Sequence, residues 1–207
     1  MSGTEGFPHP EFIKNYLIRR LDNKKDTYRL LGVDPGTNIL GYAIVEVEQK
    51  KLQLIDMGVI YLKKMQDHQD KLQHIFERLQ SIIEIYQPRE MAIEAPFYGK
   101  NPQSMLKLGR AQGVAIAAAI TKGVRITEYS PKKIKQSVTG NGNAAKEQVA
   151  AMLSNILDFK LDGYYLDATD ALATAVCHFY QSGSILSGKK RYNDWGSYLK
   201  DNPGKAK

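Results

Sequence analysis

The sequence contains a single cysteine, Cys177, among 207 residues, so no disulfide can form within the chain. Cys177 stands in an apolar stretch, where a thiol usually behaves as a small buried hydrophobic side chain. The four histidines, His9, His68, His74 and His178, are scattered along the chain. Because zinc sites need Cys or His residues at short, regular spacings, these absences exclude a disulfide-stapled scaffold and a zinc module.

Long apolar runs are also absent, and none approaches the roughly 20 residues that a membrane-spanning helix needs. The opening stretch, MSGTEGFPHPEF, lacks the basic and apolar segments of a secretion signal. Hydrophobic residues make up 43% of the chain and charged residues 25%, which is typical of soluble globular proteins. We therefore expect a cytoplasmic protein with no membrane partner.

Acidic residues are scarce in one segment of the chain. Residues 99–146 hold nine Lys or Arg and one acid, Glu128, within a chain whose net charge is +7. The segments on either side, 30–98 and 147–182, are both net negative. A positive charge concentrated in this way suits a polyanion such as nucleic acid better than it suits an ordinary solvated helix face.

The chain divides into an N-terminal extension (1–28), a domain (29–182) and a polar, basic tail (183–207). We expect a short helix over 12–21 of the extension, and we expect the tail to be mobile. Within the domain, apolar periodicity and turn residues predict these elements: strands over 29–34, 39–48, 52–62, 91–94 and 124–129, and helices over 68–87, 102–122, from 131, 144–157 and 167–181. This order predicts an α/β fold with a mixed five-stranded sheet. Three strands form an antiparallel meander, two more are parallel, and helices cover both faces.

Local residues predict how several helices begin and pack. Ser130 is a good N-cap before Pro131, and Asn143 is a candidate cap for the helix expected from 144. The helix over 102–122 contains Gly109 and Gly113, each of which costs a helix about 1 kcal/mol relative to Ala. Either another backbone approaches these glycines closely, or they fit tightly against the sheet.

Two predicted strands end in a carboxylate. The run from Leu30 to Val33 ends in Asp34, just before Pro35-Gly36, and the fourth strand ends in Glu94. A carboxylate that closes a buried strand needs a partner or a metal ion. For Asp34 the alternative is an Asx turn that leads into the following Pro-Gly.

Two further acids, Asp167 and Asp170, open the last predicted helix and share one of its faces. Their neighbours are small and apolar, so this helix should pack against the body of the protein. A favourable interaction with the helix dipole would account for Asp167 well and for Asp170 less well. If the four acids gather, they suit Mg²⁺ or Mn²⁺, and two such ions could activate water and steady a leaving 3′-oxygen during phosphodiester hydrolysis.

Five consecutive segments resemble the signature segments of RuvC-type Holliday junction resolvases, which are nucleases of the RNase H-like superfamily: LLGVDPGTNILGY, AIEAPFYGKN, MLKLGRAQG, KIKQSVTGNGNAAKEQV and LDATDALATA. The resemblance covers about residues 28–182. It implies that Asp34, Glu94, Asp167 and Asp170 are catalytic metal ligands that hold two Mg²⁺ ions, with Mn²⁺ able to substitute. Asp167 stands where the family has Asp or His.

The resemblance also implies an activity and partners. The expected enzyme is a homodimer, with an expected contact through the helix over 102–122. It cuts opposed strands of a four-way DNA junction by paired symmetric nicks, in recombination and repair. The products carry 5′-phosphate and 3′-hydroxyl ends, and a branch-migration helicase complex is the expected partner.

Several basic residues fit this activity. Lys135 and Lys146 match functional lysines of the family, and Lys146, in the first turn of its helix, is expected to be catalytic and to contact the scissile phosphate. Other basic residues are expected to hold backbone phosphates: Lys100, Lys107, Arg110, Lys132 and Lys133.

Two aromatic residues, Phe97 and Tyr98, follow Glu94 closely and are candidates to stack on DNA bases. Alternatively, Phe97 closes the core below the site. The family often has Gln and an aliphatic residue where this chain has Ala95-Pro96. That departure leaves the path of the loop, and hence the direction of Phe97, open.

Three other functions compete with the junction resolvase. The string GVDPGT also resembles the phosphate loop of actin-like ATPases, but these need two lobes, and a second D-x-G turn is missing here. A noncatalytic nucleic-acid-binding module is disfavoured because all four acids are retained. A nuclease that acts on RNA or on other branched DNA stays open, since only the resemblance disfavours it.

Overall fold

The computed structural model describes residues 27–96, 101–159 and 166–186, the last four of these in backbone only. The predicted extension and tail therefore lie almost wholly outside the described residues. The same holds for three predicted DNA-binding residues, Phe97, Tyr98 and Lys100.

The core of the fold is one five-stranded sheet with the order β3-β2-β1-β4-β5. Strands β1 (Tyr28–Asp34), β2 (Ile39–Glu48) and β3 (Lys51–Tyr61) form an antiparallel meander. Strands β4 (Glu90–Glu94) and β5 (Arg125–Tyr129) continue the sheet in parallel with β1. The predicted mixed sheet is thus confirmed, with β1 at its centre.

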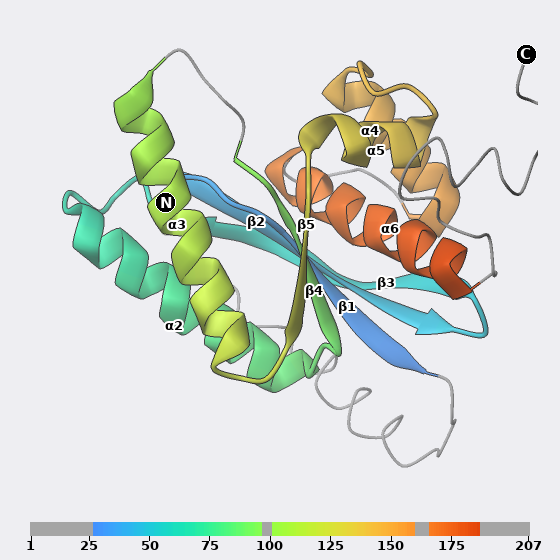
Figure 1. Cartoon of the computed structure of the whole chain (residues 1–207), viewed down its shortest axis with the longest axis horizontal. Coiled ribbons are helices and arrows are strands. Elements are labelled where there is room, and N and C mark those ends of the chain that lie inside the picture. The colour runs from blue at the N-terminus through green and yellow to red at the C-terminus, as the bar shows by residue number, and fades with distance from the viewer. Residues whose placement is uncertain (1–26, 97–100, 160–165, 187–207) are drawn as a thin grey trace, which may run out of the picture.

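Helices cover both faces of this sheet (Figure 1). Helices α2 (His68–Tyr86) and α3 (Pro102–Ile120) lie on one face, and α4 (Pro131–Thr139), α5 (Lys146–Leu157) and α6 (Leu166–Leu186) lie on the other. None of the helices among the described residues combines the length and apolar character that crossing a bilayer requires.

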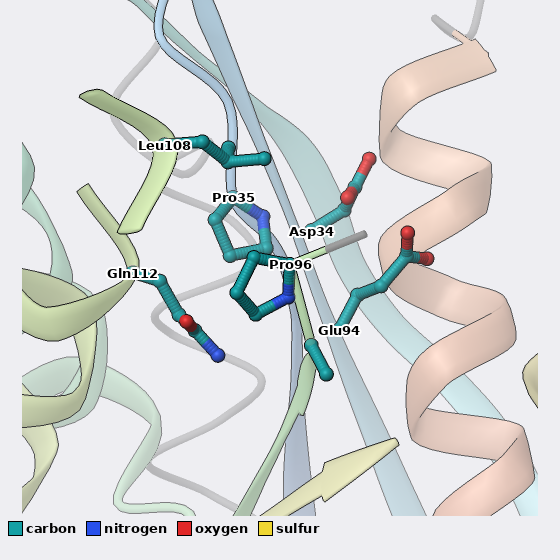
Figure 2. A pocket seen from close by; sticks show the side chains of 7 residues that line it. Asp34, Pro35, Glu94, Pro96, Leu108 and Gln112 are labelled. Carbon is teal, nitrogen blue, oxygen red and sulfur yellow. The ribbon is translucent and has the colours of Figure 1, made fainter. Parts of the chain in front are cut away.

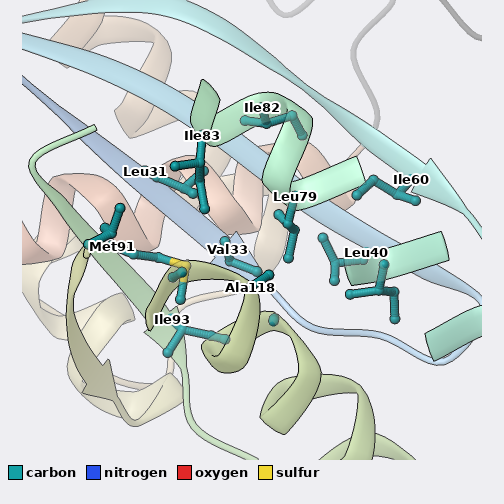
Figure 3. Close-up of a cluster of buried hydrophobic side chains, with 14 of the residues drawn as sticks. Leu31, Val33, Leu40, Ile60, Leu79, Ile82, Ile83, Met91, Ile93 and Ala118 are labelled. Carbon is teal, nitrogen blue, oxygen red and sulfur yellow. The ribbon is translucent and has the colours of Figure 1, made fainter. Parts of the chain in front are cut away.

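The two faces of β1 explain its unbroken apolar sequence. Leu31 and Val33 pack with α2 and α3, as Figure 3 shows, whereas Leu30 packs with α6 on the opposite face. A strand that is buried on both faces reads as a continuous hydrophobic run rather than as an alternating one. Cys177 is buried in the hydrophobic core between the sheet and α6, as expected.

Helix starts agree with the local sequence in one predicted case and differ in another. Ser130 caps α4 by accepting a hydrogen bond from the Lys133 amide, and Pro131 follows it, as predicted. The prediction for Asn143 is wrong, because α5 begins at Lys146 after Ala145. The Asn143 amide instead donates to the Asn141 side chain in a local turn, which delays the helix by two residues.

The glycines of α3 do not fit tightly against the sheet. A Cβ atom added to Gly109 or Gly113 would meet nothing within 4 Å among the described residues. The sheet-packing alternative is therefore wrong for both positions, and the close approach of another backbone stays a prediction.

Candidate active site at the carboxyl edge of the sheet

Two of the four predicted acids lie side by side because their strands are parallel neighbours. In the register of β1 and β4, Val33 pairs with Ile93, and Asp34 and Glu94 are the next residues of the two strands. Parallel strands end at the same edge of a sheet, so the two carboxylates leave the sheet together. Figure 2 shows both pointing toward α6.

Helix α6 brings the other two acids to this edge because two glycines let it lie directly on the sheet. A Cβ atom on Gly41 would come within 2.1 Å of the Asp167 carbonyl oxygen, and one on Gly32 within 2.1 Å of the Ala171 carbonyl oxygen. Any larger side chain would push the helix away. Gly32 and Gly41 of the LLGVDPGTNILGY segment are therefore part of the architecture of the site, a role that we did not assign from the sequence.

Three of the four acids form a compact cluster. Asp34, Asp167 and Asp170 each offer a carboxylate oxygen, and these atoms all lie within 4.8 Å of one another. Glu94 is not part of this trio but adjoins it, because the charges of Glu94 and Asp170 both act on Asp34. The structure therefore brings all four acids to one edge of the sheet, in agreement with their expected proximity.

The acids raise one another's pKa. Burial, followed by the charges of Glu94 and Asp170, raises the pKa of Asp34 to about 8. Burial, followed by the charge of Asp170, raises the pKa of Glu94 to about 7. The charges of Lys146 on both acids and of Lys135 on Glu94 act in the opposite direction but do not outweigh these effects. A divalent cation held by oxygen ligands would stabilise the ionised forms further. The donor set thus fits Mg²⁺ or Mn²⁺.

Lys146 is the first residue of α5, and its ammonium group lies among the acids. Its Nζ atom donates to Asp170 Oδ2 at 2.5 Å and lies 3.9 Å from Asp167 Oδ1. Burial alone would lower the pKa of Lys146, but the hydrogen bond to Asp170 and the surrounding negative charges outweigh it and raise the pKa. A half-exposed cation at this position faces both the cluster and solvent.

The other basic residues predicted to bind DNA that the structure describes lie on helices α3 and α4. Lys135 of α4 is close enough for its charge to lower the pKa of Glu94, against the larger raising effects of burial and Asp170. Lys107 and Arg110 lie on the exposed side of α3, and Lys132 and Lys133 lie on the first turn of α4.

One basic residue near the site was not singled out from the sequence. Lys71 of α2 donates to the Thr37 carbonyl oxygen at 3.1 Å, next to the turn that follows Asp34. Burial, followed by the charges of Arg110, Lys107 and Lys71, lowers the pKa of His68. These basic side chains therefore gather around the beginning of α2, a proximity that no local sequence signal indicates.

The model of one protein family, described as crossover junction endodeoxyribonuclease RuvC, matches residues 30–178 of the chain. The chain belongs to the RuvC family. A RuvC of Cytophaga hutchinsonii is 61% identical over 178 residues, which are 86% of this chain and 88% of the relative. A RuvC of Christiangramia forsetii is 56% identical over 178 residues, which are 86% and 92% of the two chains.

Solved structures agree with this assignment. A structure described as Thermus thermophilus RuvC in complex with a Holliday junction substrate matches with a TM-score of 0.70 at 30% identity, over 76% of this chain and 96% of that one. The yeast mitochondrial Holliday junction resolvase Ydc2 matches with a TM-score of 0.63 at 16% identity, over 85% and 88% of the two chains, and shows the fold alone. The expected RNase H-like resolvase fold is thus confirmed.

In this RuvC-family chain, a small open pocket adjoins the acids on the side of α3 (Figure 2). Seven residues line it: Asp34, Pro35, Glu94, Ala95, Pro96, Leu108 and Gln112. Asp34 and Glu94 are two of the acids, and Gln112 is a buried polar residue that we did not single out from the sequence. Gln112 donates through Nε2 to Glu128 Oε2 at 2.8 Å. The pocket lies between Asp34 and Glu94 on one side and the middle of α3 on the other.

Proposed function

We propose that this protein is an endonuclease that resolves four-way DNA junctions by paired symmetric nicks. The observation that carries this proposal is the cluster of Asp34, Asp167 and Asp170 at the edge of the sheet, in a chain that belongs to the RuvC family. The Thermus thermophilus neighbour that is described with a Holliday junction substrate supports the choice of DNA.

Asp34, Glu94, Asp167 and Asp170 are the proposed metal ligands, and Mg²⁺ is the proposed metal, with Mn²⁺ as a substitute. The fit rests on hard oxygen donors and on the raised pKa of Asp34 and Glu94. When two such ions are bound, the chemistry they supply is activation of water and stabilisation of the leaving 3′-oxygen. The products would carry 5′-phosphate and 3′-hydroxyl ends.

Contact with the scissile phosphate is the proposed role of Lys146. Its ammonium group is half-exposed and lies against Asp170, so a phosphate held at the cluster would come within its reach. There it would stabilise the negative charge that develops on the phosphate oxygens in the transition state. We assign Lys146 this catalytic role.

The basic surface around the cluster is the proposed track for the DNA backbone. It comprises five described residues: Lys107, Arg110, Lys132, Lys133 and Lys135. Contacts of this kind position the duplex arms and carry most of the salt dependence of binding. The roles proposed from the sequence for Phe97, Tyr98 and Lys100, which include stacking of the aromatic rings on bases, rest on their place directly after Glu94.

A homodimer is the proposed assembly, because paired nicks on opposed strands need two sites. Helix α3 offers a surface for it: Leu106 and Ile120 are 64% and 62% exposed. Between them, Gly109 and Gly113 leave open space where a second backbone could approach. An exposed apolar stripe with small residues suits helix-to-helix contact between two copies.

The proposed cellular context is homologous recombination and DNA repair, together with a branch-migration helicase complex. The cytoplasm is the proposed location of this protein.

The decisive experiment uses a synthetic four-way junction with Mg²⁺ and compares the wild type with Asp34→Asn. Symmetric nicks that a ligase can seal, made by the wild type and not by the variant, are the expected result. A duplex, a three-way branch and an RNA–DNA hybrid serve as competing substrates. Faster cleavage of any of these than of the junction would refute the proposed specificity.

A further inference from the structure

Gln112 is a buried polar residue at the edge of the proposed active site that the catalytic scheme does not use. It lies in the middle of α3 and is only 6% exposed. Its Nε2 atom donates to Glu128 Oε2 at 2.8 Å. Glu128 is also the one acid in the strongly basic segment 99–146, and the basic surroundings alone do not explain its presence there.

Glu128 fixes the orientation of the Gln112 amide. An ionised carboxylate only accepts hydrogen bonds, so the amide atom that faces Glu128 has to be the nitrogen. The carbonyl oxygen, Oε1, then becomes the polar atom that Gln112 can offer to the pocket. No hydrogen bond to this oxygen is present among the described residues.

The remaining walls of the pocket suit a flat, partly apolar group. Pro35, Pro96 and Leu108 line it beside Asp34 and Glu94. Figure 2 shows Leu108 and Gln112 on the α3 side, and the two carboxylates across from them. A group bound here would therefore lie next to a phosphate held at the acids. Pockets with apolar walls and a few placed polar atoms are typical ligand sites.

We propose that Gln112 is a specificity-determining residue: its Oε1 atom accepts a hydrogen bond from an N–H group on the edge of a DNA base that flanks the scissile phosphate. Glu128 is a positioning residue that keeps this acceptor turned toward the base. The inference rests on the proposed junction-cleaving function and adds to it a structural basis for a preferred sequence at the cut.

The test measures single-turnover cleavage at saturating protein and Mg²⁺, on immobile junctions that carry each of the four bases at the positions flanking the mapped cut. The wild type should cleave the junctions at different rates. In Gln112→Met, which keeps the volume and loses the acceptor, the difference at one position should shrink by roughly tenfold, the usual effect of one lost hydrogen bond.

Base analogues link the residue to the donor group. Where the preferred base is replaced by an analogue without its N–H donor, the wild type should slow by a similar factor and Gln112→Met should not. Such non-additivity identifies a direct interaction. Glu128→Gln should weaken the discrimination partly, because a glutamine partner allows the Gln112 amide to turn over.

Matched controls come from a second Gln–Glu pair on α2, where Gln73 Nε2 donates to Glu77 Oε1 at 2.7 Å. Gln73→Met and Glu77→Gln should keep the ranking of bases. An unchanged ranking in Gln112→Met, or equal wild-type rates on all bases, would overturn the proposal while leaving the resolvase function intact. Wild-type protein that cleaves no junction would refute both. If Gln112→Met does not fold, the same assay on Glu128→Gln, a change at an exposed residue, tests the proposal. Unchanged discrimination between bases in that variant would overturn it.

Discussion

The close approach of α6 to the sheet makes Gly41→Ala the most informative single change. The added Cβ atom would lie 2.1 Å from the Asp167 carbonyl oxygen, whereas ordinary contact begins at 3.4 Å, so the two must separate by about 1.3 Å. Asp167 belongs to α6, which also carries Asp170. The separation would therefore move two carboxylates away from Asp34.

The expected loss follows from this displacement. Misplacement of catalytic groups by about 1 Å can cost roughly 100-fold in rate, and overpacking of a core costs about 1–3 kcal/mol of stability. We expect Gly41→Ala to fold, to bind a junction with near wild-type affinity, and to cleave it at least about 100-fold more slowly. Binding is measured in Ca²⁺ and cleavage in Mg²⁺ under single-turnover conditions.

A matched control distinguishes the effect of displacing α6 from the effect of destabilising the protein. In Gly58→Ala the new Cβ would lie 3.0 Å from the Tyr42 ring, on the face of the sheet that packs against α2. This change should reduce stability in urea unfolding and leave the cleavage rate near that of the wild type. Full activity in a folded Gly41→Ala protein would show that the approach of α6 does not set the geometry of the cluster.

The remaining predictions concern charge. Asp34→Asn, Glu94→Gln and Asp170→Asn should each abolish cleavage and preserve junction binding; near wild-type cleavage by any of them contradicts the two-metal assignment. Lys146→Ala should lower the single-turnover cleavage rate far more than the affinity for the junction. If the variant instead binds weakly and cleaves normally once bound, Lys146 only holds a backbone phosphate. Lys107→Ala should weaken binding and flatten the dependence of log affinity on log salt by about one unit; an unchanged slope excludes a phosphate contact. In EDTA, the wild type should lose stability as the pH rises from about 4 to 8, because Asp34 must ionise in a folded environment that raises its pKa. Asp34→Asn lacks this group, so its stability relative to the wild type should increase over the same range. A difference in urea midpoint between the two proteins that is constant with pH would contradict this.

Much of the fold could be predicted because local sequence determines where elements begin and end. The apolar run before Asp34, the helical period over 68–87 and the Ser130-Pro131 start each correspond to an element of the structure. The prediction failed at Asn143, where a side chain two residues earlier formed a competing turn. Short polar residues offer such alternatives, and sequence alone does not decide between them.

The sequence by itself determined the family, the sheet and the four acids of the site, because five ordered segments and the strand ends already mark them. Only the tertiary structure decided how closely the acids meet, since that depends on α6 resting on Gly32 and Gly41. It also placed Lys146 on Asp170 and Gln112 on Glu128. The two residues of each pair are separated by 24 and 16 positions in the chain, so packing of distant elements, and no local pattern, brings them together.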